Sequence, residues 1–201
     1  YTIAFFFATG CISEWQMDEA GSKFISVNDN INSDLGKIGA EGMKKLVTSK
    51  CYVNSSATTD FDAAIPSAVV VSGTWNYENA LGLLGDNFGV AELPSFEVDG
   101  KSYHLGSYNG CKLMGVKPQS DAKKGAVLSL LAQCLTNEES QQMRYDGFQW
   151  GPSNLKAQAS EAAQAAPHLA ALAQQNAYGI PQGQIHGSWW DIAKVIATSI
   201  K

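Results

Sequence analysis

The 201-residue sequence lacks the features that mark several classes of protein. Charged residues make up only 16% of the chain, the formal net charge is −5, and the lysines and arginines form no cluster. Proteins that bind nucleic acid or an anionic membrane surface need such a cluster. The longest apolar run, residues 3–8, is far shorter than the ~18 residues of a transmembrane helix and has the length of a strand or a short helix.

Signals for catalysis, cofactors and metal ions are also lacking. The three histidines lie near no nucleophile motif, and the chain has no Gly-x-Ser-x-Gly and no phosphate-binding loop. The cysteines are widely spaced, without a Cys-x-x-Cys pair, which disfavours metal and redox sites. We therefore predict no catalytic residue, no cofactor and no metal site. A disulfide between Cys11 and Cys51 remains an alternative if the protein is exported. Cys134 is expected to be a buried thiol.

Strand-like and helix-like segments alternate along the chain, which predicts an α/β fold. Strands are expected at residues 24–27, 69–71, 88–93 and 111–116, and Asp99-Gly100 predicts a β-hairpin. Helices are expected at residues 36–49, 78–84, 120–135 and 136–147, across 153–175 with a break at Pro167, and from Ser188 onward, where Ser188 is expected to cap the helix.

The helix at 120–135 carries an apolar stripe at the i, i+3, i+4, i+7 positions. The stripe consists of Val127, Leu130, Leu131 and Cys134. Such a stripe needs a surface to cover it, so we expect the chain either to self-associate through this segment or to fold it onto the rest of the molecule. Thr136, three residues before Glu139, is expected to cap the next helix through a capping box.

Two tryptophans stand where a ligand could reach them. Trp75 follows the apolar run at 69–71 through Gly73, at the end of an expected strand, where open α/β sheets bind ligands. Trp190 lies in the first turn of the last helix, turned ~100° from a core stripe that Trp189 joins. That stripe comprises Ile192, Val195, Ile196 and Ile200. Aromatic faces match the apolar faces of sugar rings, whereas the alternative is that both tryptophans are core residues.

A series of short motifs runs through the chain in a fixed order. They are Ala8-Thr9-Gly10, Gly73-Thr74-Trp75, Leu93-Pro94-Ser95-Phe96, Asn109-Gly110, Gly151-Pro152-Ser153 and Trp189-Trp190-Asp191-Ile192-Ala193. In this order and spacing, they resemble the extracellular solute-binding proteins of sugar import systems, typified by maltose-binding protein.

The resemblance implies a type II periplasmic-binding-protein-like fold, a mixed sheet flanked by helices, with an incomplete second lobe. It implies that residues 1–105 and 160–201 form the second lobe, and that residues 106–159 are a return segment belonging to the first lobe. The sequence then looks like a piece of a longer protein, whose first lobe mostly precedes Tyr1 and whose terminal helices follow Lys201. By the same resemblance, Trp75 and Trp190 stack on sugars and Tyr1 lies beside a third aromatic of the cleft. Tyr108, which follows an expected hinge at Leu105-Gly106, is a weaker candidate whose alternative is an ordinary structural tyrosine.

The function implied is that of a sugar- or oligosaccharide-binding component of an ABC-type import system, not an enzyme, which closes two lobes on its ligand. Its partners would be the oligosaccharide and the membrane permease subunits, and its location periplasmic or at the cell surface. The alternatives are a carbohydrate-active enzyme or carbohydrate-binding module, and an α/β domain whose tryptophans are all core residues. An assay for sugar turnover would distinguish an enzyme from a binding protein.

Overall fold

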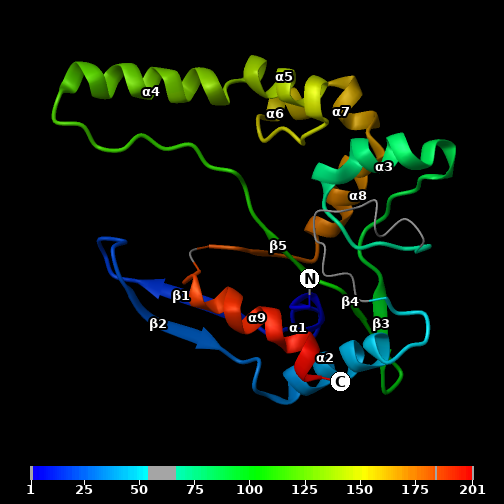
Figure 1. Ribbon diagram of the computed structural model, residues 1–201. Helices are drawn as coiled ribbons and strands as arrows, with labels where there is room; N and C mark the ends of the chain where they lie inside the picture. Colours follow the sequence, from blue (N-terminus) through cyan, green and yellow to red (C-terminus); the bar gives the residue numbers. More distant parts are fainter. Residues whose placement is uncertain (1, 54–66, 184, 201) are drawn as a thin grey trace. The chain divides into compact units, whose positions relative to one another are not determined.

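A computed structural model describes residues 2–53, 67–183 and 185–200 (Figure 1). Tyr1, one of the predicted site residues, lies outside these ranges. The chain forms two compact units: unit 1 comprises Tyr1–Val71, Glu92–Gly110 and Gln174–Lys201, and unit 2 comprises Ser72–Ala91 and Cys111–Ala173. The chain therefore crosses between the units four times, after Val71, Ala91, Gly110 and Ala173. The assignment of segments to a first and a second lobe stays a prediction.

The helical core of unit 1 is built on close contact between α1 (Ala4–Ala8) and α2 (Asp34–Val47). Glycines on α2 allow this contact, because a Cβ at Gly39 would lie 3.0 Å from the carbonyl oxygen of Phe5, and one at Gly42 would overlap the ring of Phe96. Cys11 and Met43 are buried in the same core. The predicted helix at 36–49 is confirmed.

The strands of the described residues form three separate two-stranded sheets, all in unit 1 (Figure 1). Two are antiparallel hairpins: β1 (Ser13–Met17) with β2 (Phe24–Asp29), and β3 (Ser95–Val98) with β4 (Lys101–His104). The third pairs β5 (Ser107–Asn109) in parallel with β6 (Gly179–Pro181). The predicted hairpin at Asp99-Gly100 is confirmed, and both turn residues have positive φ (51° and 75°), the geometry that suits a two-residue hairpin loop.

The strands predicted at 69–71, 88–93 and 111–116 are not formed: no described strand pairs with these segments. Their apolar side chains are largely exposed, with Val69 at 81% and Leu113 at 92% of their full accessibility. β propensity reflects packing against neighbouring strands, and an apolar β-branched run without a partner forms no ladder. All three segments lie at a crossing between the units: 69–71 ends at one, 88–93 spans one, and 111–116 follows one directly.

Unit 2 is helical. It comprises η2 (Thr74–Asn76), α3 (Tyr77–Leu84), η3 (Gly85–Asn87), α4 (Ala122–Thr136), α5 (Glu138–Phe148), α6 (Leu155–Gln158), α7 (Glu161–Ala165) and most of α8 (Pro167–Asn176). The side chain of Asp121 caps α4 by accepting from the amides of Lys123 (2.8 Å) and Lys124 (3.2 Å). Pro167 ends the preceding helix, as predicted, and opens α8 at the first position, where its missing N–H costs nothing.

Two predicted helix caps are wrong by one residue. Thr136 is still helical, and its hydroxyl donates to the carbonyl of Ala132 (2.8 Å), so Asn137 caps α5 by accepting from the amide of Ser140 (2.9 Å). Ser188 is the first residue of α9 (Ser188–Ser199), and its amide donates to Nδ1 of His186 (3.2 Å). In both cases the helix includes a hydroxyl residue that can bond locally instead of capping.

The burial predicted for Cys134 is also wrong. Cys134 is exposed, and Val127, Leu130 and Leu131 are 66%, 60% and 51% exposed, so no described part of the chain covers this stripe. Helical periodicity located the apolar face without identifying what covers it. The Cys11–Cys51 alternative is settled as well, because all four thiols are free and only that of Cys11 is buried.

Candidate functional site

The last helix places two adjacent tryptophans in opposite environments. Trp189 is 7% exposed, whereas Trp190, turned away from the core, is 39% exposed. This is the order that helical geometry predicts. The predicted core stripe is only half correct, because Ile196 and Ile200 pack against the core of unit 1. Ile192 and Val195, by contrast, are 58% and 53% exposed. Ile192 and Val195 lie about 200° and 140° around the helix from Trp190, so they do not share its face.

Tyr108 meets Trp190 in unit 1. Its strand β5 is fixed by parallel pairing with β6, in which Tyr108 lies opposite Ile180. The Tyr108 ring contacts Trp190 edge to face, with centroids 6.1 Å apart, and contacts Phe7 on its other side at 4.7 Å. Such edge contacts are favourable aromatic geometries. The structure therefore brings together two of the four predicted site residues, from segments about 80 positions apart in the sequence.

The hydroxyl of Tyr108 points into the protein. Its oxygen and the indole nitrogen of Trp189 are both buried, and neither makes a hydrogen bond of regular geometry. Burial raises the pKa of Tyr108, the nearby indole N–H of Trp189 opposes this shift in pKa, and the negative charge of Asp29 adds to it. The hydroxyl is thus neutral at physiological pH, and Tyr108 serves as a rigid support for the Trp190 ring.

Trp75 lies in η2 of unit 2 and is 61% exposed. Its ring folds back over Gly73, where a Cβ would collide with the indole, so the glycine is required for this ring position. The side-chain amide of Asn76 donates to the hydroxyl of Ser72 (2.7 Å) and braces the same turn. Because Trp75 and Trp190 belong to different units, the expectation that they share one cleft stays a prediction.

A buried histidine supports the helix that follows Trp75. His168 is 1% exposed, its ring stacks on Tyr77 with centroids 3.8 Å apart, and its Nε2 bonds the carbonyl of Gln149 (2.9 Å). A ring nitrogen bonded to a carbonyl acts as the donor, and Nδ1 is buried with no hydrogen-bond partner in the described structure. His168 is a structural residue of unit 2.

The family to which the chain belongs follows from a comparison of its sequence with family models. The model described as "Bacterial extracellular solute-binding protein" matches residues 18–171, well over half of the chain. The chain belongs to this family. A search of curated proteins found no significant match.

Solved structures show which fold this solute-binding protein has. The maltodextrin-binding protein MalE1 from L. casei BL23 without ligand is 20% identical, with a TM-score of 0.70 over 98% of this chain and 52% of that one. A structure described as "with acarbose" is 24% identical, with a TM-score of 0.78 over 100% and 52%. The maltose-maltodextrin binding protein of the thermoacidophilic bacterium Alicyclobacillus acidocaldarius is 22% identical, with a TM-score of 0.68 over 100% and 54%.

The chain thus spans about half the length of these similar proteins. The likeness confirms the predicted type II periplasmic-binding-protein-like fold. None of the described helices has the length and hydropathy to cross a membrane. Among the described residues, no group of three or more His, Cys, Asp or Glu side chains is placed to hold a metal ion.

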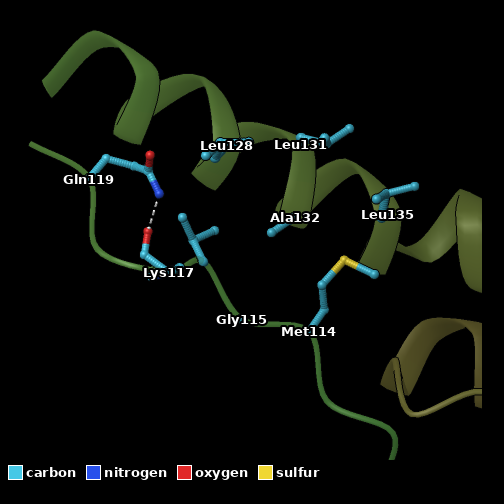
Figure 2. Close-up of a pocket in the computed structure, with 9 residues that line it drawn as sticks. Met114, Gly115, Lys117, Gln119, Leu128, Leu131, Ala132 and Leu135 are labelled. Atoms are coloured by element: carbon cyan, nitrogen blue, oxygen red, sulfur yellow. Dashed lines mark hydrogen bonds between the residues drawn. The ribbon is translucent and has the colours of Figure 1, made fainter. Parts of the chain in front are cut away.

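The solute-binding protein has a shallow pocket of about 240 Å³ in unit 2, between α4 and the loop that precedes it (Figure 2). Its lining is mainly apolar: Met114, Gly115, Val116, Leu128, Leu131, Ala132 and Leu135, with Lys117 and Gln119. The amide of Gln119 is already bonded to the carbonyl of Lys117 (2.7 Å). A sugar needs several convergent polar groups beside an aromatic face, so this pocket does not suit one.

One aromatic group, centred on the half-buried Trp15, was not predicted from the sequence. Trp15 on β1 stacks on His186 with centroids 6.0 Å apart, and Phe24 on β2 meets the same imidazole edge-on at 5.2 Å. The position of Trp15 depends on the register of the β1–β2 hairpin, which pairs Trp15 with Val27. Only the second strand of this hairpin was predicted, so the position of Trp15 could not be derived.

Proposed function

We propose that this solute-binding protein binds an oligosaccharide by stacking sugar rings on exposed tryptophans. The observation that carries the proposal is the pair of environments on α9, where Trp189 anchors the helix and Trp190 is held open at 39% exposure against Tyr108. An aromatic ring that packs against another residue on one side and is exposed to solvent on the other loses little conformational freedom when a flat apolar ligand face binds it.

Trp75 supplies the second stacking face in this proposal, because it is the most exposed of the three tryptophans that the motifs single out (61%) and the absence of a side chain at Gly73 leaves room for its ring. Tyr1 would add a third aromatic beside them. Tyr108 contributes by supporting Trp190, since its own hydroxyl is buried. Closure of two lobes around the ligand would bring these surfaces together and exclude water from the stacked rings.

The ligand class we propose is the α-linked glucose oligomers. Support comes from the printed descriptions of three similar structures, two of maltodextrin-binding proteins and one with acarbose. The protein would deliver the ligand to membrane permease subunits of an ABC importer, as a periplasmic or surface-anchored component. In this role it binds without turnover.

Titration calorimetry with maltose, maltotriose, maltoheptaose and acarbose tests the proposal, alongside an assay for released reducing sugar. We expect binding of at least one maltodextrin, no hydrolysis, and loss of binding in Trp190→Ala. Trp150→Ala is the matched control, because Trp150 is similarly exposed (51%) but lies in a separate aromatic pair with Phe148. Hydrolysis would establish the enzyme alternative, and absence of binding to every glycan tested would overturn the proposal.

A further inference from the structure

One buried glutamine joins three segments of unit 1 that are distant in the sequence. Gln175, 7% exposed, accepts a hydrogen bond from the amide of Leu93 (2.9 Å). Its side-chain nitrogen donates to the carbonyl of Leu105 (3.0 Å) and to the hydroxyl of Ser107 (3.3 Å). We call this set of three hydrogen bonds the Gln175 bridge. All of its members belong to unit 1.

Each segment in the bridge lies beside a point where the chain passes between the units. Leu93 is the second residue of unit 1 after the crossing that follows Ala91, and Gln175 is the second residue after the crossing that follows Ala173. Ser107 lies three residues before the crossing that follows Gly110. A single side chain therefore ties three of the four crossings together on the unit 1 side.

The chemistry of the bridge requires a carboxamide. The Leu93 amide needs an acceptor and the Leu105 carbonyl needs a donor, and the carboxamide of Gln175 supplies its oxygen to the first and its nitrogen to the second. A glutamate would keep the bond to Leu93 but would place a carboxylate oxygen against the Leu105 carbonyl. A leucine would remove the acceptor of the part-buried Leu93 amide and would leave the Leu105 carbonyl with only Nδ1 of His104 (3.0 Å) beside it, which costs free energy.

The surrounding contacts reinforce the same point. The amide of Leu105 donates to the carbonyl of Pro94 (3.1 Å), and the amide of Gly106 donates to the carbonyl of Ala4 (3.2 Å). Gly106 itself has no room for a side chain, because a Cβ there would lie 2.7 Å from Cβ of Phe7. The crossing segments are thus bonded both to one another and to the core of unit 1.

We propose that Gln175 is a positioning residue that fixes where the crossing segments leave unit 1, and so sets the pivot about which unit 2 moves. The same bonds hold the start of β5 and with it Tyr108, the support of Trp190. The pivot is a property of the chain itself, whereas its effect on sugar affinity rests on the proposed function.

Two substitutions cut the bridge in different ways. Gln175→Leu removes all three bonds, and Gln175→Glu keeps the bond to Leu93 but removes both donors. Gln174→Leu is the matched control, because Gln174 is exposed and lies one position earlier on the same helix. If Gln175→Leu does not fold, the comparison of Gln175→Glu with this control still decides the question.

The measurement is the distribution of distances between one spin label on each unit, taken without ligand. Lys44→Cys labels α2 of unit 1, and the native Cys134, which is exposed, labels unit 2. Cys51→Ser and Cys111→Ser remove the other exposed thiols and leave only the buried Cys11. Amide exchange at Leu93 is followed in parallel, together with the thermal midpoint.

We expect both Gln175 variants to broaden the distance distribution relative to wild type and Gln174→Leu. The Leu93 amide should exchange about tenfold faster in Gln175→Leu, in line with the loss of one buried hydrogen bond. A lower thermal midpoint with an unchanged distribution would show that Gln175 only stabilises unit 1 and would overturn the proposal. Because no ligand is present, a broadened distribution supports the pivot even if the protein binds no sugar.

Discussion

The adjacent tryptophans of α9 allow a direct test of which aromatic supports the fold and which serves a ligand. Trp189 is 7% exposed, so Trp189→Ala should leave a cavity and cost about 3–5 kcal/mol in the free energy of unfolding. Trp190 is 39% exposed and has one edge contact, with Tyr108. Loss of that contact costs about 0.5–1.5 kcal/mol beyond the loss of its partly buried apolar area, so Trp190→Ala should cost less than Trp189→Ala and remain folded.

Urea denaturation followed by far-ultraviolet circular dichroism measures both variants without relying on tryptophan emission. Calorimetry on the folded Trp190→Ala protein should then show maltodextrin affinity weakened by about 2 kcal/mol, roughly 30-fold, the scale of an interface hot spot. Equal losses of stability in the two variants, or a larger loss for Trp190→Ala, would refute the division of roles. Unchanged affinity in a folded Trp190→Ala protein would refute the stacking role alone.

Three further results are expected. Burial raises the folded-state pKa of Tyr108, so the contribution of Tyr108 to stability is complete below about pH 10, the unfolded value, and is lost as the pH rises through the folded pKa. Urea titrations between pH 8 and 11 should show a smaller alkaline loss of stability in Tyr108→Phe than in wild type, and an identical profile would contradict this. Asn137→Ala should lower the free energy of unfolding by about 1 kcal/mol and Thr136→Ala by less, because only Asn137 caps α5. The reverse order in thermal melts would support the predicted capping box at Thr136 instead. The isolated chain should self-associate through the exposed α4 stripe, so light scattering should report oligomers that Leu131→Gln dissociates; a wild-type monomer at high concentration would exclude this route.

Local signals in the sequence were sufficient where a segment's structure depends on its own residues. The helix at 36–49 carries its glycines and apolar residues at helical spacing, and Asp99-Gly100 can adopt the positive φ that a short hairpin needs. The opposite burial of Trp189 and Trp190 followed from one fixed angle per residue. These predictions needed no knowledge of distant contacts.

Predictions failed where the deciding partner is distant in the sequence or where two local bonds compete. Residues 69–71 have the composition of a strand but no described strand pairs with them, and Cys134 lies on a helical stripe whose members are largely exposed. At Thr136 the hydroxyl bonds back to Ala132 and the cap passes to Asn137. For the site, the contact of Tyr108 with Trp190 depends on the pairing of β5 with β6, and no periodicity reveals such pairing.

The discontinuous composition of unit 1 constrains how the protein is made. Its core combines Phe5 and Met43, Leu105, and Ile196 and Ile200 near the C-terminal end, with all of unit 2 emerging from the ribosome in between. Unit 1 therefore cannot complete its core until Ile196 and Ile200 have been synthesised. Its contacts have high sequence separation, which slows folding and lengthens the time that apolar surface is exposed. Pulse-chase proteolysis of nascent chains should show unit 1 becoming resistant only after α9 has been made.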